Sequence, residues 1–141
     1  MRFDPNIWGS HYWFFLHTVA HSYPEYPNAV TKRKYYDLIN NMPLFIPIPE
    51  MGDKFSHLLD KYPVSPYLDK KESFIRWVHF IHNKVNQMIG KPEVSYLKSI
   101  DNYYSNYKPM PLVLFEKWNI RKYLMFLLWM FLFLFIIYLY R

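Results

Sequence analysis

Apolar residues follow a helical spacing along most of this chain. Near the N-terminus, four positions recur at intervals of three or four residues and predict one buried helix face: Trp13, Leu16, His17 and Ala20. Tyr23-Pro24 marks the expected end of that helix, because proline cannot continue it. A second helix is expected after Asn28, a good N-cap residue, and should run towards Met42.

Prolines interrupt the helical pattern in the next segment. Pro43, Pro47 and Pro49 lie too close together for one regular helix to contain them. Pro49 followed by Glu50 suits the first turn of a third helix. The inward residues of that helix are expected to be Phe55, Leu58 and Leu59.

The longest regular pattern follows Asp69, which forms a capping-box spacing with Glu72. Intervals of three and four residues then predict the inward face of a long helix that stops at Gly90: Phe74, Trp77, Val78, Ile81, Val85 and Met88. A fifth helix is expected over residues 95–107. Together these patterns predict an all-α fold, a small bundle of four to five helices.

Residues 123–140 differ from the rest, because they are all apolar or aromatic, YLMFLLWMFLFLFIIYLY. As a helix this run would be about 27 Å long, close to the roughly 30 Å hydrocarbon layer of a bilayer. Aromatic and cationic residues flank it as interface anchors: Trp118, Tyr123, Tyr138, Tyr140, Lys117, Arg121, Lys122 and Arg141. We therefore expect a helical domain over 1–108, a linker and juxtamembrane segment over 109–122, and a transmembrane helix over 123–140.

The alternative, a buried core helix, is disfavoured because a helix apolar on every side needs a much larger domain to cover it. With no apolar signal segment near the N-terminus, the pattern predicts a tail-anchored, single-pass membrane protein. Lys117, Arg121 and Lys122 put the bundle on the cytoplasmic side by the positive-inside tendency, and Arg141 is a weak opposing signal.

The net charge of +6 does not indicate nucleic-acid binding. Several cations flank the membrane segment, where anionic lipid headgroups account for them. The others come in short runs such as 32–34, and no nucleic-acid motif accompanies them. We therefore expect membrane lipid, and no nucleic acid, as a partner.

Two sequence blocks resemble the Erv/ALR family of FAD-linked sulfhydryl oxidases. The first, WGSHYWFFLHTVAHSYP, is similar to the family's Trp-Gly, Trp, Leu-His, Ala and Tyr-Pro pattern. The second, RWVHFIHNKVNQMIGKP, is similar to its flavin-binding His-Asn-x-Val-Asn with a trailing Gly-Lys-Pro. The resemblance covers roughly residues 7–107 and implies a helical bundle that holds FAD.

The resemblance also implies which side chains form the flavin pocket: Trp8, Trp13, His17, Tyr23, His82, Asn83, Val85, Asn86, Lys91 and Tyr103. Flat rings can stack on adenine, Asn amides can bond a purine edge, and a lysine can reach a diphosphate. The same rings at helical spacing are also typical of a packed core without cofactor. The His pairs 17/21 and 79/82 have spacings that could bind zinc, but with no cysteine or nearby carboxylate we expect no metal.

The chain departs from the family at its redox centre. Ile48 and Met51 stand where the resemblance puts the two cysteines of Cys-x-x-Cys, and the chain has no cysteine at all. Neither side chain can form the disulfide that passes electrons from a dithiol to flavin. Pro49 is a further departure, since it stiffens the same turn.

Three interpretations follow from this absence. The first is a thiol-less pseudoenzyme with a structural or interaction role. Its membrane tail resembles that of oxidases of large DNA viruses, which suggests a minor capsid or inner-membrane virion component that contacts viral capsid or membrane proteins. The second is a sulfhydryl oxidase that uses cysteines supplied by a partner. The third is a sequence whose cysteines were removed, although Ile and Met are unusual replacements for that purpose. Erv-like domains pair through their first two helices, which implies a homodimer or a heterodimer with an active paralogue.

Overall fold

The computed structural model describes residues 3–109 and 113–140, and within them it contains helices and no strand. The chain divides into two compact units, Met1–Asn106 and Tyr107–Arg141. The elements of the first unit are α1 (Pro5–His21), α2 (Ala29–Asn41), the 3₁₀ turn η1 (Met42–Phe45), α3 (Pro49–Lys61), the 3₁₀ turn η2 (Ser65–Tyr67), α4 (Lys71–Met88) and α5 (Tyr96–Ser105). The predicted all-α bundle is therefore confirmed.

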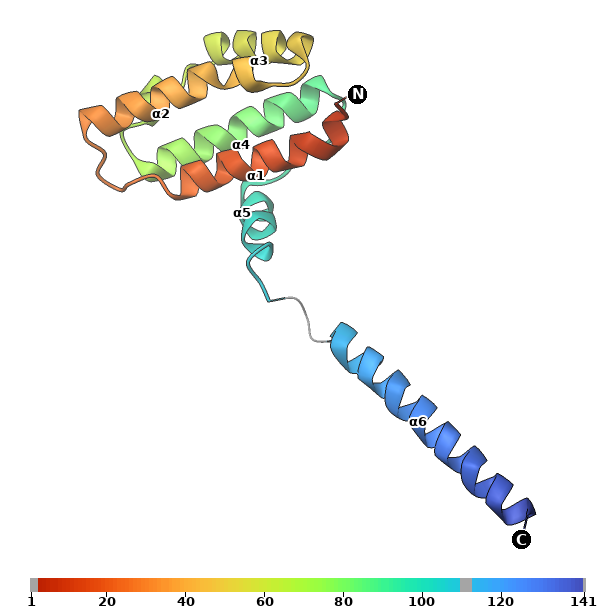
Figure 1. Ribbon diagram of the computed structural model, residues 1–141. Helices are drawn as coiled ribbons and strands as arrows, with labels where there is room; N and C mark the ends of the chain where they lie inside the picture. The colour runs from red at the N-terminus through yellow and green to blue at the C-terminus, as the bar shows by residue number, and fades with distance from the viewer. Residues whose placement is uncertain (1–2, 110–112, 141) are drawn as a thin grey trace. The chain divides into compact units, whose positions relative to one another are not determined.

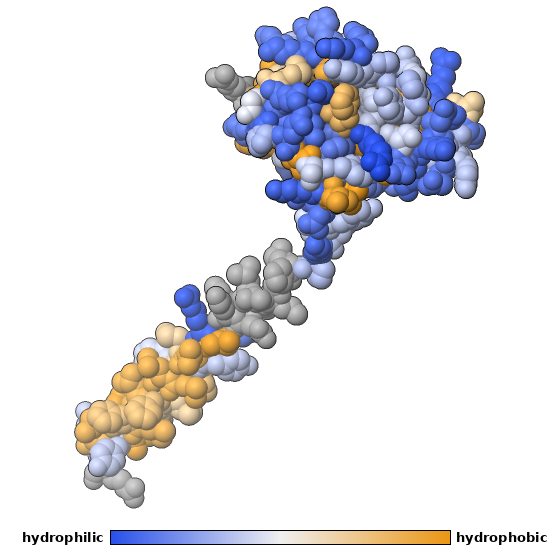
Figure 2. Space-filling view, turned by 180° about the vertical axis from the view of Figure 1, so that it is seen from behind, coloured by the Kyte–Doolittle hydropathy of each residue, from blue (hydrophilic) through white to orange (hydrophobic). Residues whose placement is uncertain are grey.

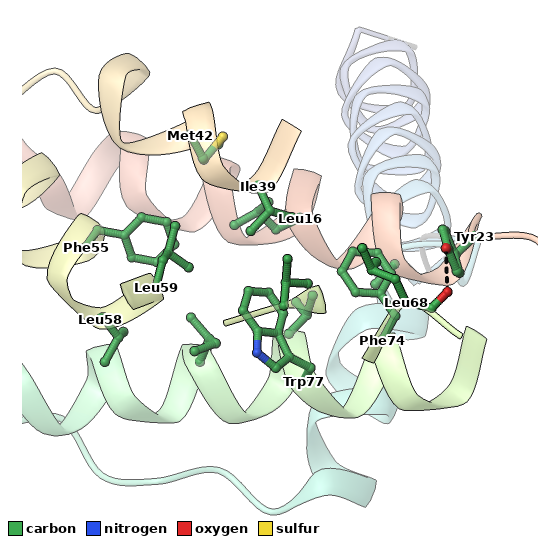
Figure 3. Packing of buried hydrophobic residues seen from close by; sticks show 14 residues of the cluster. Leu16, Tyr23, Ile39, Met42, Phe55, Leu58, Leu59, Leu68, Phe74 and Trp77 are labelled. Carbon is green, nitrogen blue, oxygen red and sulfur yellow. Dashed lines mark hydrogen bonds between the residues drawn. The ribbon is translucent and has the colours of Figure 1, made fainter. Parts of the chain in front are cut away.

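Figure 1 shows α1 and α4 side by side, with α2 and α3 forming a second layer over them. Side chains from all four helices, from η1 and from Val64 and Leu68 on either side of η2 fill the space between the layers. The largest fully buried side chains are Tyr23, Phe74, Ile81, Val64 and Val78. Figure 3 shows how the core side chains from the two layers meet around Trp77.

Polar side chains fix where several helices begin. The Asp4 carboxylate accepts a hydrogen bond from the Asn6 backbone N–H at 2.8 Å, directly ahead of Pro5. The Asn28 side chain accepts from the Thr31 N–H at 2.8 Å, as predicted from the sequence. These caps satisfy backbone donors that the first helical turn leaves without a partner.

The predicted capping box at the start of α4 is wrong. Lys70, not Asp69, is the N-cap residue, and no side chain caps the helix there. Because Asp69 lies one residue too early, its carboxylate instead binds the Lys32 ammonium of α2 at 2.6 Å. Glu72 pairs with Arg76 one turn later, at 2.7 Å.

The buried face of α4 is shorter than its apolar spacing predicts. Phe74, Trp77 and Ile81 are buried as expected, but Met88 is 50% exposed. The helix ends there, and Gly90 adopts φ of 73° in the turn that follows. The apolar spacing therefore continues past the buried face, which ends before Met88.

The second unit consists mainly of α6 (Val113–Leu139), whose segment Asn119–Leu139 is long and apolar enough to cross a membrane. Figure 2 shows apolar residues over most of the coloured part of this helix, whereas the face of the first unit in that view is mostly polar. The helix begins inside the expected linker 109–122, of which residues 110–112 lie outside the described part. The side chains of the expected anchors Lys117, Trp118 and Arg141 also lie outside the described part.

Gly52 allows α3 to approach η1 closely. A Cβ atom at this position would lie 2.7 Å from the Pro43 carbonyl oxygen, a backbone atom that cannot easily move away. We expect Gly52→Ala to lower the free energy of unfolding by roughly 1–3 kcal/mol. Near-UV circular dichroism of the full chain in detergent, followed through denaturant unfolding, measures this.

Gly9→Ala is the matched control, because nothing lies within 4 Å of a Cβ added in the middle of α1. It should leave stability unchanged or raise it by roughly 0.5–1 kcal/mol. Equal stability of the two variants would contradict the close approach at Gly52.

Candidate cofactor site

A cleft of about 950 Å³ lies in the first unit, between α1, α3, α4, α5 and the segment after α4. All the expected flavin-pocket residues except Tyr23 line it: Trp8, Trp13, His17, His82, Asn83, Val85, Asn86, Lys91 and Tyr103. Residues from opposite ends of the domain sequence thus come together around one space. Its volume is in the range of small-molecule and cofactor sites.

Tyr23 lies in the core, not in the cleft. Its side chain is only 1% exposed, and its hydroxyl donates a hydrogen bond to the Leu68 carbonyl at 2.8 Å (Figure 3). Its ring meets Tyr35 and Phe74 edge to face. Tyr23 therefore ties the end of α1 to the start of α4.

Two stacked ring pairs form flat surfaces in the cleft region. Trp13 of α1 and His82 of α4 stack at 4.0 Å between centroids, with 7° between their planes. His21 of α1 and Tyr103 of α5 stack at 4.5 Å, with 8° between planes. The Trp13 ring also meets Phe55 of α3 edge to face. Flat faces of this kind suit the planar rings of a nucleotide or a flavin.

The histidines of the site are held neutral. Burial lowers the pKa of His17 to about 4, with smaller contributions from the nearby His21 and His79. Burial likewise lowers the pKa of His82 to about 4, helped by His17, His79 and Lys91. The His17 Nε2 and His82 Nδ1 atoms are 3.2 Å apart, so one ring donates and the other accepts. Neutral imidazoles that offer both a donor and an acceptor can bind a purine edge.

The Asn83 amide bonds the backbone of the segment that follows α4. Its Nδ2 donates to the Val94 carbonyl at 2.9 Å, and its Oδ1 accepts from the Val94 N–H at 3.0 Å. The Lys91 N–H donates to the Asn86 carbonyl at 2.8 Å, in the turn that Gly90 makes. Together these bonds hold the cleft-lining segment that carries Lys91. The sequence identified Asn83 as a site residue but not this role.

The indole N–H of Trp8 supports occupation of the cleft by a ligand. Its Nε1 atom is buried and has no hydrogen-bond partner among the described residues. A buried donor without an acceptor costs about 1–3 kcal/mol, unless something else supplies the acceptor. An FAD molecule carries phosphate, hydroxyl and carbonyl oxygens that could do so, so the residues present fit the cofactor.

The position of the missing redox centre adjoins the cleft. Met51 lines it, while Ile48 is the half-buried N-cap of α3 and does not. The Met51 N–H donates to the Ile48 carbonyl at 3.0 Å, so the two residues stand one helical turn apart. This turn can bring two side chains together but offers no thiol, since the chain has no cysteine.

Sequence reasoning missed two cleft residues on α3. Lys54 was not identified at all, and Phe55 was expected only as a core residue although it also lines the cleft. Lys54 follows Met51 by three positions, so helical spacing alone puts both on one face of α3. That spacing could have identified it. Among the described residues, no group of three His, Asp or Glu side chains could hold a metal ion.

The neutral histidine pair makes stability depend on pH. The folded pKa values of about 4 lie below the ordinary 6.5, so the unfolded chain takes up these protons first as pH falls. The melting temperature should be highest above pH 6.5 and should fall as the pH drops from 6.5 to about 4. Below pH 4 the histidine pair should cause no further decrease in the melting temperature. Thermal unfolding of the full chain across this range measures it, and His17→Gln/His82→Gln should flatten the slope. An unchanged slope in the double variant would contradict this assignment.

Comparison with known proteins agrees with this geometry. The chain is 32% identical over 99 residues to "Probable FAD-linked sulfhydryl oxidase R368" of Acanthamoeba polyphaga mimivirus. This match covers 70% of this chain and 69% of that protein. It is 34% identical over 79 residues to an FAD-linked sulfhydryl oxidase of Arabidopsis thaliana. That match covers 56% of this chain and 40% of the plant protein, so the chain spans less than half of that relative's length.

Solved structures agree as well. The yeast Erv1 core superposes with a TM-score of 0.64 at 25% identity, covering 77% of this chain and 86% of that one. The FAD binding domain of Saccharomyces cerevisiae Erv1 gives the same score and covers 76% of this chain and 96% of that one. Residues 10–105 match the Erv1/Alr family as a whole. The helical domain with its aromatic cleft is thus an Erv1/Alr domain, and the chain belongs to that family.

Proposed function

We propose that this chain is a membrane-anchored Erv1/Alr protein that binds FAD in its cleft but cannot oxidise thiols by itself. The observation that carries this proposal is Met51, a thioether on the cleft wall where the family resemblance implies a redox cysteine. The cysteine-free sequence leaves no other residue to replace it. The relatives' names as FAD-linked oxidases support the cofactor.

Bound FAD would supply a two-electron acceptor. The chain's own residues would bind and orient it: Trp13, His82 and Tyr103 by stacking, and Trp8 by donating its orphaned indole N–H. Lys91, on the segment that Asn83 clamps, would neutralise diphosphate charge. Asn86 and Val85 would complete the wall formed by α4.

Without a thiol in this turn, electrons from a dithiol substrate have no protein disulfide through which to reach the flavin. Ile48 and Met51 fill the corresponding space with apolar atoms, so the fold tolerates the loss. A protein that keeps the cleft and loses the relay is best suited to an interaction role, in which the cofactor stabilises the scaffold.

The interaction role we propose is that of a virion component of a large DNA virus, at the inner membrane or as a minor capsid protein. The similarity to a mimivirus protein supports a viral setting. The apolar segment of α6 would anchor the chain, and Arg121 and Lys122 near the N-terminal end of this segment favour the cytoplasmic side for the bundle. Exposed Ile7 and Phe15 on α1 offer an apolar surface for a homodimer or for pairing with an active paralogue.

A second candidate function is thiol oxidation with cysteines supplied by a partner. The position of Met51 on the cleft wall favours it, because cysteines that a partner brings to this turn would lie beside the cofactor site. This candidate predicts dithiol turnover once the partner is added. The scaffold predicts none with or without it.

The cofactor is tested by purifying the full chain in detergent and recording its visible spectrum. We expect bound flavin and no oxygen consumption with dithiothreitol. Trp8→Phe keeps an aromatic ring, although a smaller one, and removes the indole N–H. It should weaken FAD affinity by roughly tenfold, the effect of one buried hydrogen bond. A colourless, folded protein that does not take up added FAD would overturn the proposal.

Trp77→Phe is the matched control. The Trp77 Nε1 atom donates to the Tyr62 carbonyl at 3.1 Å in the core, outside the cleft. The control should lower stability by about 1 kcal/mol and leave FAD affinity unchanged. Equal loss of FAD affinity in both variants would mean that the Trp8 effect is general destabilisation.

The missing relay is tested by the double variant Ile48→Cys/Met51→Cys. Since the two positions stand one turn apart at the start of α3, we expect a disulfide there and flavin-dependent oxidation of dithiothreitol. Each single variant should stay inactive, because one cysteine cannot form the disulfide. A double variant that binds flavin and forms the disulfide but shows no turnover would mean that the chain lacks other requirements for catalysis besides the two cysteines.

A further inference from the structure

Helix α5 presents one face to the bundle. The residues on this face follow helical spacing and line the domain: Tyr96, Ser99 and Tyr103. The Tyr96 ring meets His79 edge to face at 5.4 Å between centroids. Tyr103 is buried, and its hydroxyl donates to the Thr18 hydroxyl oxygen at 3.2 Å. This face accounts for how α5 closes one side of the cleft.

A second, apolar stripe runs along the flank of α5. Leu97, Ile100 and Tyr104 are three and four residues apart and so lie on one line of the helix. Leu97 is 79% exposed and Tyr104 is 50% exposed, although the Tyr104 ring also touches His21. Lys98 lies about 100° further around the helix than Leu97. Ile100, between them, is half-buried, so Leu97 is the most exposed member of the stripe.

The covalent chain limits how far this stripe can be from the membrane. The first unit ends at Asn106, and the membrane-crossing segment begins at Asn119. Residues 107–112 can span at most about 20 Å when extended, and the helical residues 113–118 add about 9 Å. The end of α5 must therefore stay within about 30 Å of the bilayer surface, which gives the stripe a high effective concentration of lipid.

We propose that the Leu97–Ile100–Tyr104 stripe of α5 docks on the lipid bilayer, with its side chains at the level of the headgroups. A leucine and a tyrosine on one line suit this depth, where an apolar body meets a polar layer. The stripe alone buries too little surface for a stable protein interface, but it suffices for a tethered contact. The docked helix brings the α5 wall of the cofactor cleft to the lipid surface. This inference rests on the proposed anchoring by α6.

The cysteine-free sequence allows a direct test, because any introduced cysteine is the only labelling site. We would prepare the full chain with one fluorophore, at Leu97→Cys, Lys98→Cys, Leu44→Cys or Leu132→Cys, in vesicles of phosphatidylcholine and phosphatidylserine. Brominated lipids then quench labels that lie at the bilayer. Leu44, on η1, is the matched control because it is also 79% exposed. Leu132 reports on α6 itself.

We expect quenching of the Leu97 label to exceed that of the Lys98 and Leu44 labels by roughly twofold or more, the pattern of a helix that lies in the interface. Equal, weak quenching at positions 97, 98 and 44, with strong quenching at 132, would overturn the docking and leave the anchoring intact. Weak quenching at 132 would overturn the anchoring itself and this inference with it. In detergent, the Leu97 label could become less accessible to a soluble quencher as the protein concentration rises. That result would assign the stripe to contact with a second copy of the chain and would also overturn the docking.

Discussion

The contact between α1 and α4 is the interaction on which both the core and the cleft depend. On one side of this contact, Leu16 and Ile81 are buried in the core. Towards the cleft, the Trp13 ring stacks on His82 and lies tilted against the His17 ring. A change in the packing of these two helices would therefore alter the stability of the bundle and the shape of the cofactor site together. The site is built from the packing of the core and is not an addition to its surface.

Burial of two imidazoles beside each other is the energetic cost of this arrangement. His17 and His82 are close enough to hydrogen bond, and desolvation keeps both neutral. A packed core would place apolar side chains here at lower cost. The retention of a polar pair, together with the orphaned Trp8 N–H, is better explained by a ligand that uses these groups than by packing alone.

The first turn of α3 has the close packing of a structured site but no residue that can form a disulfide. Gly52 still permits close approach to Pro43, and Ile48 and Met51 still stand one turn apart beside the cleft. The sulfur atoms that a redox disulfide would need are absent, since the chain has no cysteine. Packing needs only apolar volume at these positions while disulfide chemistry needs sulfur, so the fold itself does not depend on a redox centre in this turn.

Much of this could be read from the sequence, because the information is local. The spacing of Phe74, Trp77 and Ile81 determined a buried helix face, Asn28 determined a helix start, and residues 123–140 determined a helix apolar on all sides. Of the ten pocket residues that the family resemblance implied, all but Tyr23 line the cleft, although many further residues line it as well. The absence of cysteine was also a property of the sequence alone.

Tertiary structure decided the matters that depend on distant partners. Tyr23 went to the core because the Leu68 carbonyl, far along the chain, accepts its hydroxyl, and Asp69 paired with Lys32 instead of capping a helix. Asn83 became a clamp because Val94 folds back onto it. No local pattern encodes such choices, since each polar group binds whichever partner the packing of the whole domain brings within reach.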